Sequence, residues 1–386
     1  MKHDKVLITG GMGFIGRCIA GILVEHGWDV LLFDNLNPQV HGAVPRHNGD
    51  KLFQHPCVQV FRGDVRHAAD WAKVLPEVRY VVHLASETGT AQSMYEISRY
   101  TETNVGGISE LLNYLANQPH DIRKIILASS RAVYGEGAYR CVQCGLVYPG
   151  ARSGEMLSAG QWEPQCPTCA GEVAAVATPE SAVLAPASIY AATKLAQEDL
   201  LHIASKALGI PAVIFRMQNV YGEGQSLRNP YTGLLTILAG QLRVGRMLNL
   251  FEDGQASRDF VHVDDAARSV TMALHSDAAD GCTLNVGSGR ATSVEKIAAL
   301  LCDCFGLKRH YRITGQYRLG DVRHGLADLE RIQAKLGFEP QVSLEAGLER
   351  LVDWVKAQPI EPDQWETATR ELVERGLMPC SEVQVG

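Results

Sequence analysis

Three glycines between a predicted strand and a predicted helix constrain this chain more than any other feature of its sequence. The segment VLITGGMGFIGRCIAGILVEHG contains Gly10, Gly13 and Gly16 after a short β-rich run and before a helical pattern. Because glycine has no Cβ, such a loop can turn tightly, and its backbone can approach a pyrophosphate at the helix N-terminus. The spacing is GxxGxxG rather than the commoner GxGxxG. Glycines alone are weak evidence, since any strand–turn–helix can use them.

The following strand favours a dinucleotide site. DVLLFDNL ends its apolar run at Asp34, eighteen residues beyond Gly16. A carboxylate at this position accepts hydrogen bonds from the adenosine ribose and repels a 2′-phosphate, which favours NAD over NADP. The alternative is an aspartate that only caps a turn. Further along, FRGDVR places Asp64 near the expected adenine, and His83 in HLAS is interpreted as a packed histidine.

Strands and helices alternate through the first third of the chain. KVLITG, DVLLFD, VQVFRGD, RYVVHLA and KIILASS are predicted as strands, with PAVIFRMQNVYG and TLNVGSG as later ones. This alternation predicts an α/β fold of the Rossmann type, a doubly wound parallel sheet with helices on both faces. We expect an NAD-binding domain over residues 1–215 and a smaller, mainly substrate-binding lobe over 216–357. Segments near 260–288 should return to the first domain, and residues 358–386 should form a helical tail.

The composition limits the function classes. The formal net charge of −7 argues against a protein that acts on nucleic acid or on an anionic membrane. No apolar run reaches transmembrane length, and MKHDKVLITG enters a strand without the apolar stretch of a signal peptide. We therefore expect a cytoplasmic protein.

Residues 136–187 interrupt the alternation and are rich in Gly, Pro, Ala and Cys. Two CxxC pairs, CVQC and CPTC, supply four thiols: Cys141, Cys144, Cys166 and Cys169. Two such pairs can hold a structural Zn²⁺ in a ribbon-like insertion, and four protein ligands leave no open position for catalysis. The alternatives are two local disulfides or four free thiols. The insertion should lie near the active-site mouth, as a lid, a wall or a partner-binding site. The other cysteines are interpreted as small buried hydrophobes: Cys18, Cys57, Cys282, Cys302, Cys304 and Cys380.

A second motif suggests catalysis. In SIYAATK, Tyr190 and Lys194 are four residues apart, so both side chains lie on one face of a helix. A phenol is a poor base at neutral pH because its ordinary pKa is about 10. A nearby ammonium and an oxidised nicotinamide would favour the phenolate and lower that pKa. Ser130, at the end of the ILASS strand, could hydrogen-bond a reacting sugar oxygen.

These motifs occur in a recognisable order. TGGMGFIG, FDNL, GDVR, HLA, TNVGG, ASSRAVYG, YAATK, RMQNVYG and SRDFVHVDD follow one another between residue 5 and about residue 350. The chain resembles the extended short-chain dehydrogenase/reductase family, in its nucleotide-sugar epimerase and dehydratase branch. The resemblance implies a catalytic triad of Ser130, Tyr190 and Lys194. It implies a homodimer formed through helices around 93–117 and 188–208.

The resemblance also implies binding residues. The expected cofactor contacts are Gly10, Gly13, Phe14, Ile15, Gly16, Asp34, Asn35, Asp64, Val65, Leu84, Ala85, Asn104, Tyr190 and Lys194. The expected contacts to a nucleoside-diphosphate sugar are Ser130, Asn219, Arg258 and Arg318. Arginine suits the diphosphate because its planar fork donates two hydrogen bonds to phosphate oxygens.

Residues missing from the chain narrow the reaction. Dehydratases of this branch place an Asp-Glu pair after the active-site hydroxyl, where this chain has Arg131 and Ala132. Without that acid and base, C4 epimerisation through transient oxidation by bound NAD is the favoured reaction. The CxxC pairs and QSLRNPYTG are similar to bacterial dTDP-L-rhamnose 4-epimerases, which form dTDP-6-deoxy-L-talose. UDP-glucose/galactose-type epimerases and other NDP-sugar dehydratases or reductases remain alternatives. A catalytically idle NAD-binding scaffold is the non-enzyme alternative, which the intact tyrosine and lysine disfavour.

Overall fold

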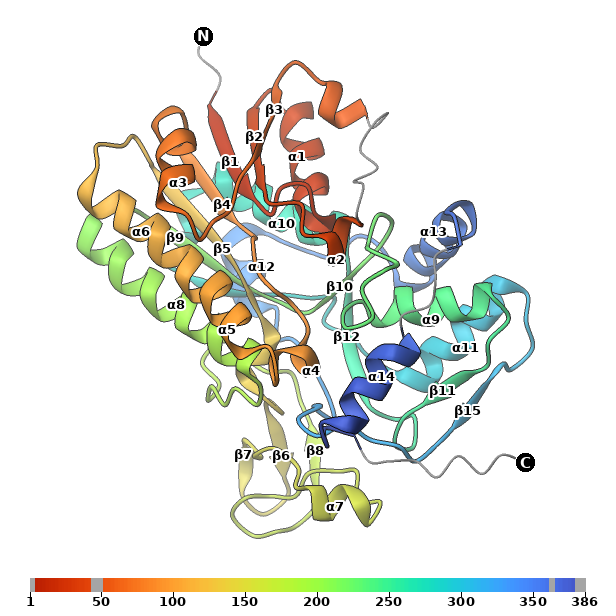
Figure 1. Ribbon diagram of the computed structural model, residues 1–386. Helices are drawn as coiled ribbons and strands as arrows, with labels where there is room; N and C mark the ends of the chain where they lie inside the picture. The colour runs from red at the N-terminus through yellow and green to blue at the C-terminus, as the bar shows by residue number, and fades with distance from the viewer. Residues whose placement is uncertain (1–3, 43–50, 361–364, 379–386) are drawn as a thin grey trace.

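The structure, a computed structural model, describes residues 4–42, 51–360 and 365–378, and a seven-stranded parallel sheet lies at its centre (Figure 1). The strand order is β13-β9-β5-β4-β1-β2-β3. The strands are β1 (Lys5–Thr9), β2 (Asp29–Asp34), β3 (Val58–Arg62), β4 (Tyr80–His83), β5 (Lys124–Ser130), β9 (Ala212–Met217) and β13 (Thr283–Val286). The predicted Rossmann-type parallel sheet is confirmed.

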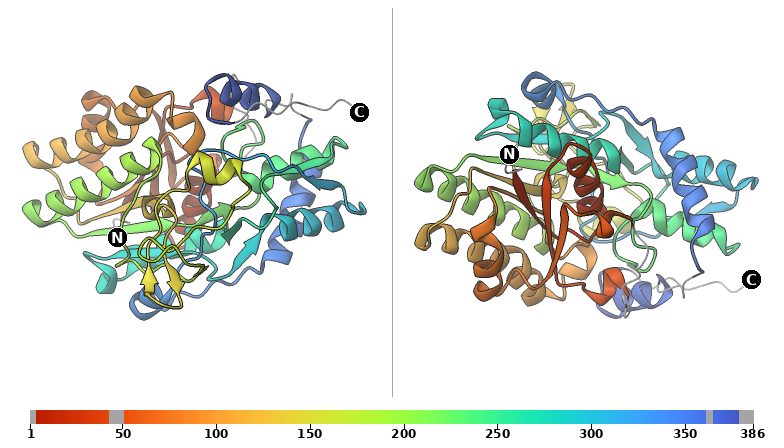
Figure 2. Two further views of the ribbon diagram at one scale, coloured as in Figure 1. Left: turned by 90° about the horizontal axis from the view of Figure 1, so that it is seen from below. Right: turned by 90° about the horizontal axis from the view of Figure 1, so that it is seen from above.

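Helices cover both faces of this sheet (Figure 2). Leu7 and Leu31 belong to one core cluster, whereas Ile8 and Leu32 belong to the other, as expected where successive residues of a strand point to opposite faces. The helices of the first cluster's face are α3 (Ala68–Val74), α6 (Gly107–Asn117) and α8 (Ile189–Leu208). Those of the other face are α1 (Phe14–Glu25), α10 (Val263–His275) and α12 (Glu330–Leu336).

The chain leaves the central sheet at Gln218 and forms the second lobe. The prediction of one strand over PAVIFRMQNVYG is wrong, because β10 (Asn219–Tyr221) pairs with β12 (Ser257–His262) and not with the central sheet. The lobe also contains β11 (Leu248–Leu250), β14 (Ala291–Ser293), β15 (Tyr311–Ile313), α9 (Leu234–Arg243), α11 (Val294–Phe305) and α13 (Leu344–Ala357), around a third apolar cluster.

Segments from the second half of the chain return to the first lobe. Helix α10 and strand β13 do so within the expected range 260–288. Ile332 of α12 and Phe338 also pack in a core cluster of the central sheet. The segment 330–338 therefore lies with the first lobe, although it falls inside the range 216–357 assigned mainly to the second.

Residues 136–187 form a small unit below the two lobes in Figure 1. Its antiparallel sheet has the order β7-β6-β8, from β6 (Tyr139–Cys141), β7 (Gly145–Val147) and β8 (Val173–Ala175), with α7 (Gly154–Ser158) beside it. Its small core consists of Tyr139, Val147 and buried cysteines. This unit is called the insertion below.

The remaining short helices lie near the junction of the lobes. They are α2 (Pro38–His41), α4 (Thr90–Ser93), α5 (Ile97–Tyr100) and the C-terminal α14 (Trp365–Glu374). Within the predicted helical tail, residues 361–364 and 379–386, which include Cys380, lie outside the described residues. Of the other scattered cysteines, Cys302 is buried and Cys18, Cys57, Cys282 and Cys304 are half-buried. No helix among the described residues is both long and apolar enough to span a membrane.

Candidate active site

One pocket of about 590 Å³ lies at the carboxyl ends of the central strands and is lined by both lobes. Ligand sites in open parallel sheets are expected at this edge. Most of the residues singled out from the sequence line it: Gly10, Gly13, Phe14, Ile15, Gly16, Asp34, Asn35, Val65, Leu84, Ala85, Ser130, Tyr190, Lys194, Asn219, Arg258 and Arg318.

The glycine loop at one end of the pocket leaves no room for side chains. Gly10 has a φ of +64°, and a Cβ there would lie 3.0 Å from the backbone nitrogen of Ala85. A Cβ on Gly16 would lie 2.6 Å from the carbonyl oxygen of Gly10. The loop leads into the N-terminus of α1 at Phe14, where free backbone N–H groups favour an anion. This cradle fits the pyrophosphate of a dinucleotide.

Asp34 at the end of β2 has two roles. Its carboxylate accepts hydrogen bonds from the backbone N–H groups of Met12 at 3.1 Å and Leu36 at 2.9 Å. It therefore does cap a turn, as the simpler interpretation holds. The same side chain also lines the pocket beside the glycine loop, where a ribose would lie.

Two predicted cofactor contacts do not line the pocket. The carboxylate of Asp64 accepts two hydrogen bonds from the guanidinium of Arg66, at 2.9 and 2.7 Å. Burial raises the pKa of Asp64, but the bonds from Arg66 outweigh it and bring the pKa to about 2. Asn104 is fully buried, and its amide is used up by Ser86, Glu87 and Thr193. In this structure Asn104 holds the loop after β4, and its predicted contact with the cofactor stays a prediction.

The three catalytic candidates converge from two elements. Helix α8 begins at Ile189 because the side chain of Ser188 accepts a hydrogen bond from the N–H of Ala191. Tyr190 and Lys194 therefore lie in its first two turns and both face the pocket. Ser130, the last residue of β5, lines the same pocket, and its hydroxyl acts to lower the pKa of Tyr190.

Desolvation dominates the electrostatics of this group. Burial raises the pKa of Tyr190, and the hydrogen bond with Ser130 acts in the opposite direction. Burial lowers the pKa of Lys194 to about 7, against the opposing charge of Glu198. Because its pKa is about 7, Lys194 is only partly charged at neutral pH, which weakens its effect on the pKa of Tyr190 in the protein alone. His83 is packed, as interpreted, with Nδ1 2.9 Å from Thr9 Oγ1.

A buried ion pair lies beneath these residues and was not foreseen from the sequence. Glu198 of α8 pairs with Arg216 of β9 at 2.6 Å. The hydroxyl of Ser129, on β5, donates to the same carboxylate. Arg216 also donates to the carbonyl oxygen of Glu180, at the base of the insertion. The pair joins the elements that carry the serine, the tyrosine and the lysine.

Three arginines line the opposite end of the pocket. Arg258 on β12 donates to the carbonyl oxygens of Ser257 at 2.8 Å and Arg323 at 3.1 Å. Arg131, which directly follows Ser130, donates to the carbonyl oxygen of Gly135 at 2.7 Å. Burial and the charge of Arg258 lower the pKa of Arg131 to about 10. Within the described part of the chain, neither these two nor Arg318 forms an ion pair, which suits them to an anionic ligand. Sequence reasoning used Arg131 only to argue against a dehydratase.

The C-terminal helix α14 packs against Arg318, one of the arginines that line the pocket. The guanidinium of Arg318 lies between the rings of Phe251 and Trp365, 4.9 and 5.0 Å from their centroids. Its buried Nε has no hydrogen-bond partner among the described residues. Glu371 accepts hydrogen bonds from the hydroxyls of Tyr95 and Tyr231, at 2.9 and 2.6 Å, one from each lobe. Helix α14 thus ties the two lobes together beside Arg318.

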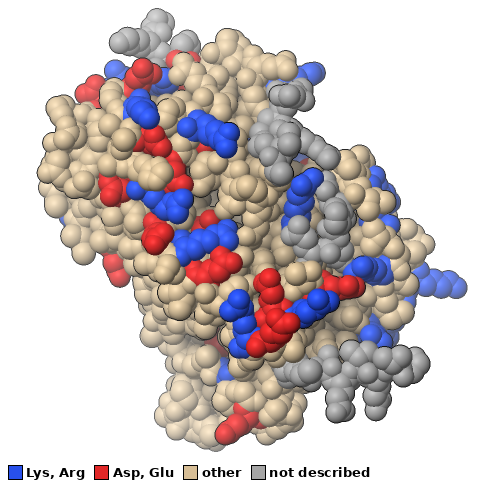
Figure 3. All heavy atoms as spheres, viewed as in Figure 1, with Lys and Arg blue, Asp and Glu red and all other residues tan. Residues whose placement is uncertain are grey.

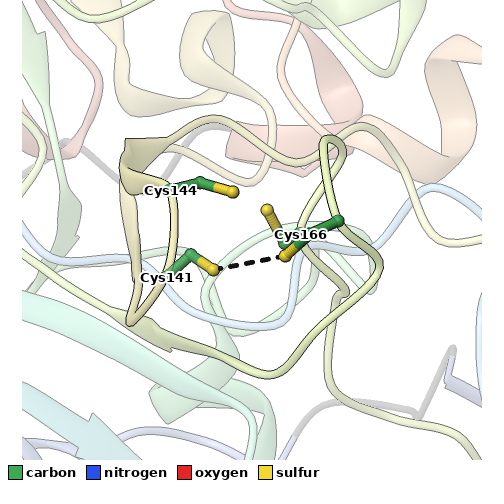
Figure 4. A group of neighbouring side chains, drawn as sticks. Cys141, Cys144 and Cys166 are labelled. Carbon is green, nitrogen blue, oxygen red and sulfur yellow. Dashed lines mark hydrogen bonds between the residues drawn. The ribbon is translucent and has the colours of Figure 1, made fainter.

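The four cysteines of the insertion form a second candidate site. Their sulfur atoms all lie within 4.8 Å of one another, and none is in a disulfide. Cys141 Sγ and Cys169 Sγ are 3.6 Å apart. Figure 4 shows the sulfurs of Cys141, Cys144 and Cys166 turned toward a common centre.

On the face drawn in Figure 3, acidic and basic side chains are interspersed over the lobes, and the insertion below shows few charges.

Comparison with known proteins agrees with this site. The model of a family described as the NAD dependent epimerase/dehydratase family matches residues 6–145 and 166–287. The intervening residues 146–165 belong to the insertion. A dTDP-L-rhamnose 4-epimerase of Burkholderia thailandensis is 38% identical over 355 residues, which cover 91% of this chain and 94% of that protein. A putative UDP-glucose 4-epimerase of Methanocaldococcus jannaschii is 28% identical, with 91% and 98% covered.

Solved structures of similar proteins share the fold. UDP-glucose 4-epimerase from Thermotoga maritima with UDP-glucose has a TM-score of 0.72 and 27% identity, and covers 91% of this chain and 98% of its own. A mutant UDP-glucuronic acid 4-epimerase from Bacillus cereus, in complex with NAD and a fluorinated UDP-sugar, has a TM-score of 0.74 and 25% identity. It covers 91% of this chain and 99% of its own.

The lowered pKa of Lys194 is directly measurable. Only a neutral amine is acetylated by acetic anhydride, so acetylation of Lys194 in protein freed of nucleotide should reach half its maximal rate near pH 7, because burial lowers its pKa to about 7. Peptide mass spectrometry across pH 5 to 11 reads the rate at each lysine. The exposed Lys206 of the same helix is the internal control. A half-maximal pH for Lys194 equal to that of Lys206 would contradict the burial argument.

Proposed function

This chain belongs to the NAD dependent epimerase/dehydratase family, and on that premise we propose that it inverts C4 of a nucleoside-diphosphate hexose with NAD retained in its pocket. The observation that carries the proposal is the convergence of Ser130, Tyr190 and Lys194 between the glycine cradle and the arginines. The relatives described above are nucleotide-sugar 4-epimerases by name, which supports an enzyme over an idle scaffold.

The chain's own residues remove and return the proton of the sugar 4-hydroxyl. When bound, NAD supplies the acceptor for the C4 hydride and later returns it. Tyr190 takes the hydroxyl proton as the hydride leaves C4 and gives it back when the hydride returns, while Ser130 hydrogen-bonds the same oxygen. Because burial raises the pKa of Tyr190, the phenolate needs a nearby positive charge. Lys194 supplies one when protonated, and the Glu198 carboxylate favours that form.

Inversion requires the oxidised sugar to present its other face. The arginines can hold the diphosphate throughout, since their guanidiniums are not engaged in ion pairs with described residues. The two positions after Ser130 are Arg131 and Ala132, so no carboxyl group is present there to catalyse the elimination of water from the sugar. This arrangement favours epimerisation over dehydration.

We propose dTDP-L-rhamnose as the substrate and dTDP-6-deoxy-L-talose as its C4 epimer. The 38% identity to the Burkholderia protein, over nearly the full length of both chains, supports this choice. UDP-glucose and UDP-galactose are the second candidates, supported by the archaeal relative and the Thermotoga structure.

Incubation without added NAD tests the reaction. Purified protein should convert dTDP-L-rhamnose to its C4 epimer, separated by chromatography, because the cofactor is regenerated in each turnover. The Tyr190→Phe variant should retain NAD but lose roughly 10²- to 10⁴-fold in rate, the usual contribution of a general acid–base group. Turnover of UDP-galactose alone would replace the proposed substrate. Failure with both sugars, even with NAD supplied, would reject the C4-epimerase proposal.

We also propose that the four cysteines bind one structural Zn²⁺. Tetrahedral ligation with Zn–S bonds of about 2.3 Å places sulfurs roughly 3.8 Å apart. The distance of 3.6 Å between Cys141 Sγ and Cys169 Sγ fits this geometry. Two of the four cysteines, Cys141 and Cys166, also make up half of the buried core of the insertion, so a metal would stabilise a unit with little apolar material.

Metal analysis distinguishes zinc from the alternatives. The wild-type protein should contain about one zinc per chain by atomic emission, because the thiols fill one tetrahedral shell. Cys166→Ser should lose it, whereas Cys57→Ser, at a half-buried cysteine outside the cluster, should retain it. Metal-free wild-type protein with four titratable thiols, or with two disulfides by mass spectrometry, would overturn the zinc proposal.

We propose a homodimer formed through the face of α6 and α8, which lie side by side (Figure 1). Ile203 of α8 is 68% exposed on this chain. Ile203→Glu should therefore shift sedimentation from dimer toward monomer, since a buried interfacial charge is costly. Ile360→Glu, at a 69% exposed isoleucine that follows α13, should leave the dimer intact. A monomeric wild-type protein at micromolar concentration would refute the dimer.

A further inference from the structure

The segment 318–328, which carries Arg318, runs between the insertion and the second lobe. On one side, the N–H of Thr178 in the insertion donates to the carbonyl oxygen of Leu326 at 2.9 Å, and the N–H of Asp328 donates back to Thr178 at 3.1 Å. On the other side, Ser257 exchanges backbone hydrogen bonds with Arg323 and Gly325, both at 3.0 Å. The segment is thus paired with both units at once.

Arg323 fixes the middle of this segment with charge from both sides. Its side chain is 1% exposed. Glu163 of the insertion lies 2.7 Å from it, while Glu252 and Asp253 of the second lobe lie 2.8 and 2.7 Å away. Its backbone N–H also donates to Glu136 at 2.8 Å. The arginine links the insertion to the lobe.

Arg152 of the insertion makes the reciprocal connection. Its side chain is 1% exposed and reaches Glu252 of the second lobe at 2.9 Å and Glu136 at 3.3 Å. It also donates to the carbonyl oxygen of Asp321 at 2.9 Å. Buried ion pairs are costly to desolvate and tolerate little misalignment, so interlocked arginines and carboxylates favour one arrangement of the segment.

The position of this segment determines where the arginines at the expected diphosphate end of the pocket lie. The carbonyl oxygen of Arg323 accepts a hydrogen bond from Arg258 at 3.1 Å. Arg318, Gly320, Asp321 and Val322 line the pocket directly. A shift of segment 318–328 would therefore move both arginines that face the expected diphosphate.

We propose that Arg152 and Glu163 are positioning residues, through which the insertion holds segment 318–328 so that Arg258 and Arg318 meet the substrate's diphosphate. The ligand's identity rests on the proposed function, but the positioning rests on these contacts. The insertion then supports the substrate site from behind segment 318–328 and is a determinant of its affinity. The insertion's low surface charge, with Arg140 and Arg152 as its basic residues and Arg152 buried, gives a docking role less support.

Calorimetric titration with dTDP, and separately with UDP, tests the proposal without turnover. Arg152→Met should weaken binding of the nucleoside diphosphate by about 3- to 30-fold, the usual range for coupling through a network. Glu163→Gln should act in the same direction, and Arg152→Lys should restore part of the affinity. In steady-state assays KM should rise while kcat and bound NAD stay unchanged, because the triad and the glycine loop are untouched.

Lys124→Met is the matched control. Lys124 is also a buried cation, 4% exposed and 2.8 Å from Asp280, but it lies at the far end of β5 from the pocket. This variant should unfold at lower temperature while binding nucleoside diphosphates as the wild type does.

Zinc-free Cys166→Ser protein should show the affinity loss of Arg152→Met.

Other outcomes contradict the positioning role, the proposed reaction or both. Wild-type affinity in both Arg152→Met and Glu163→Gln would do so, as would an equal loss of affinity in Lys124→Met. If Arg152→Met does not fold, Glu163→Gln decides alone, because its side chain is half-exposed. A wild-type protein that epimerises neither sugar yet loses diphosphate affinity in these variants would reject the proposed reaction and keep the positioning role. Failure of the wild type to bind dTDP or UDP would overturn both.

Discussion

The reacting end of the pocket depends on the buried ion pair between Glu198 and Arg216. Removing one partner of such a pair costs about 3–5 kcal/mol, because the other is left as an uncompensated charge. The pair therefore fixes the spacing of α8, β5 and β9, and Ser129 bonds the same carboxylate. Glu198 is also one turn after Lys194, so the carboxylate that Arg216 holds in place opposes the desolvation of the lysine. The side chain of Glu198 therefore both fixes the packing of these elements and acts on the pKa of Lys194.

Regular patterns and local motifs were legible from the sequence, whereas long-range polar contacts were not. The strand at β9 was predicted correctly, but its end was not, because nothing in PAVIFRMQNVYG marks the change of sheet at Gln218. The pairing of Glu198 with Arg216 leaves no periodic signal. Asn104 matched a family motif, and its amide bonds Glu87 in the loop after β4 and Thr193 of α8. A sequence motif indicates where a residue lies in the fold, whereas the hydrogen bonds of that residue in the folded protein determine which groups it contacts.

For the insertion too, features set by residues close together in the sequence could be predicted, whereas contacts between residues far apart in the sequence could not. Its place between the strand of Ser130 and the helix of Tyr190 predicts a location near the pocket, because both flanks end at one edge of the sheet. Its four thiols are recognisable from spacing alone. Its contact with segment 318–328 joins Glu163 to Arg323, 160 residues apart. No pattern in a single sequence predicts that pairing.

The distribution of charge explains why such support is useful to this chemistry. A sugar that must turn over between two hydride transfers cannot be gripped by its ring, so the binding energy has to come from the diphosphate. The pocket fits this requirement, with the hydroxyl groups of Ser130 and Tyr190 at one end and guanidiniums at the other. Holding the arginines rigidly from the insertion lets the sugar stay loose without losing the position of its anchor.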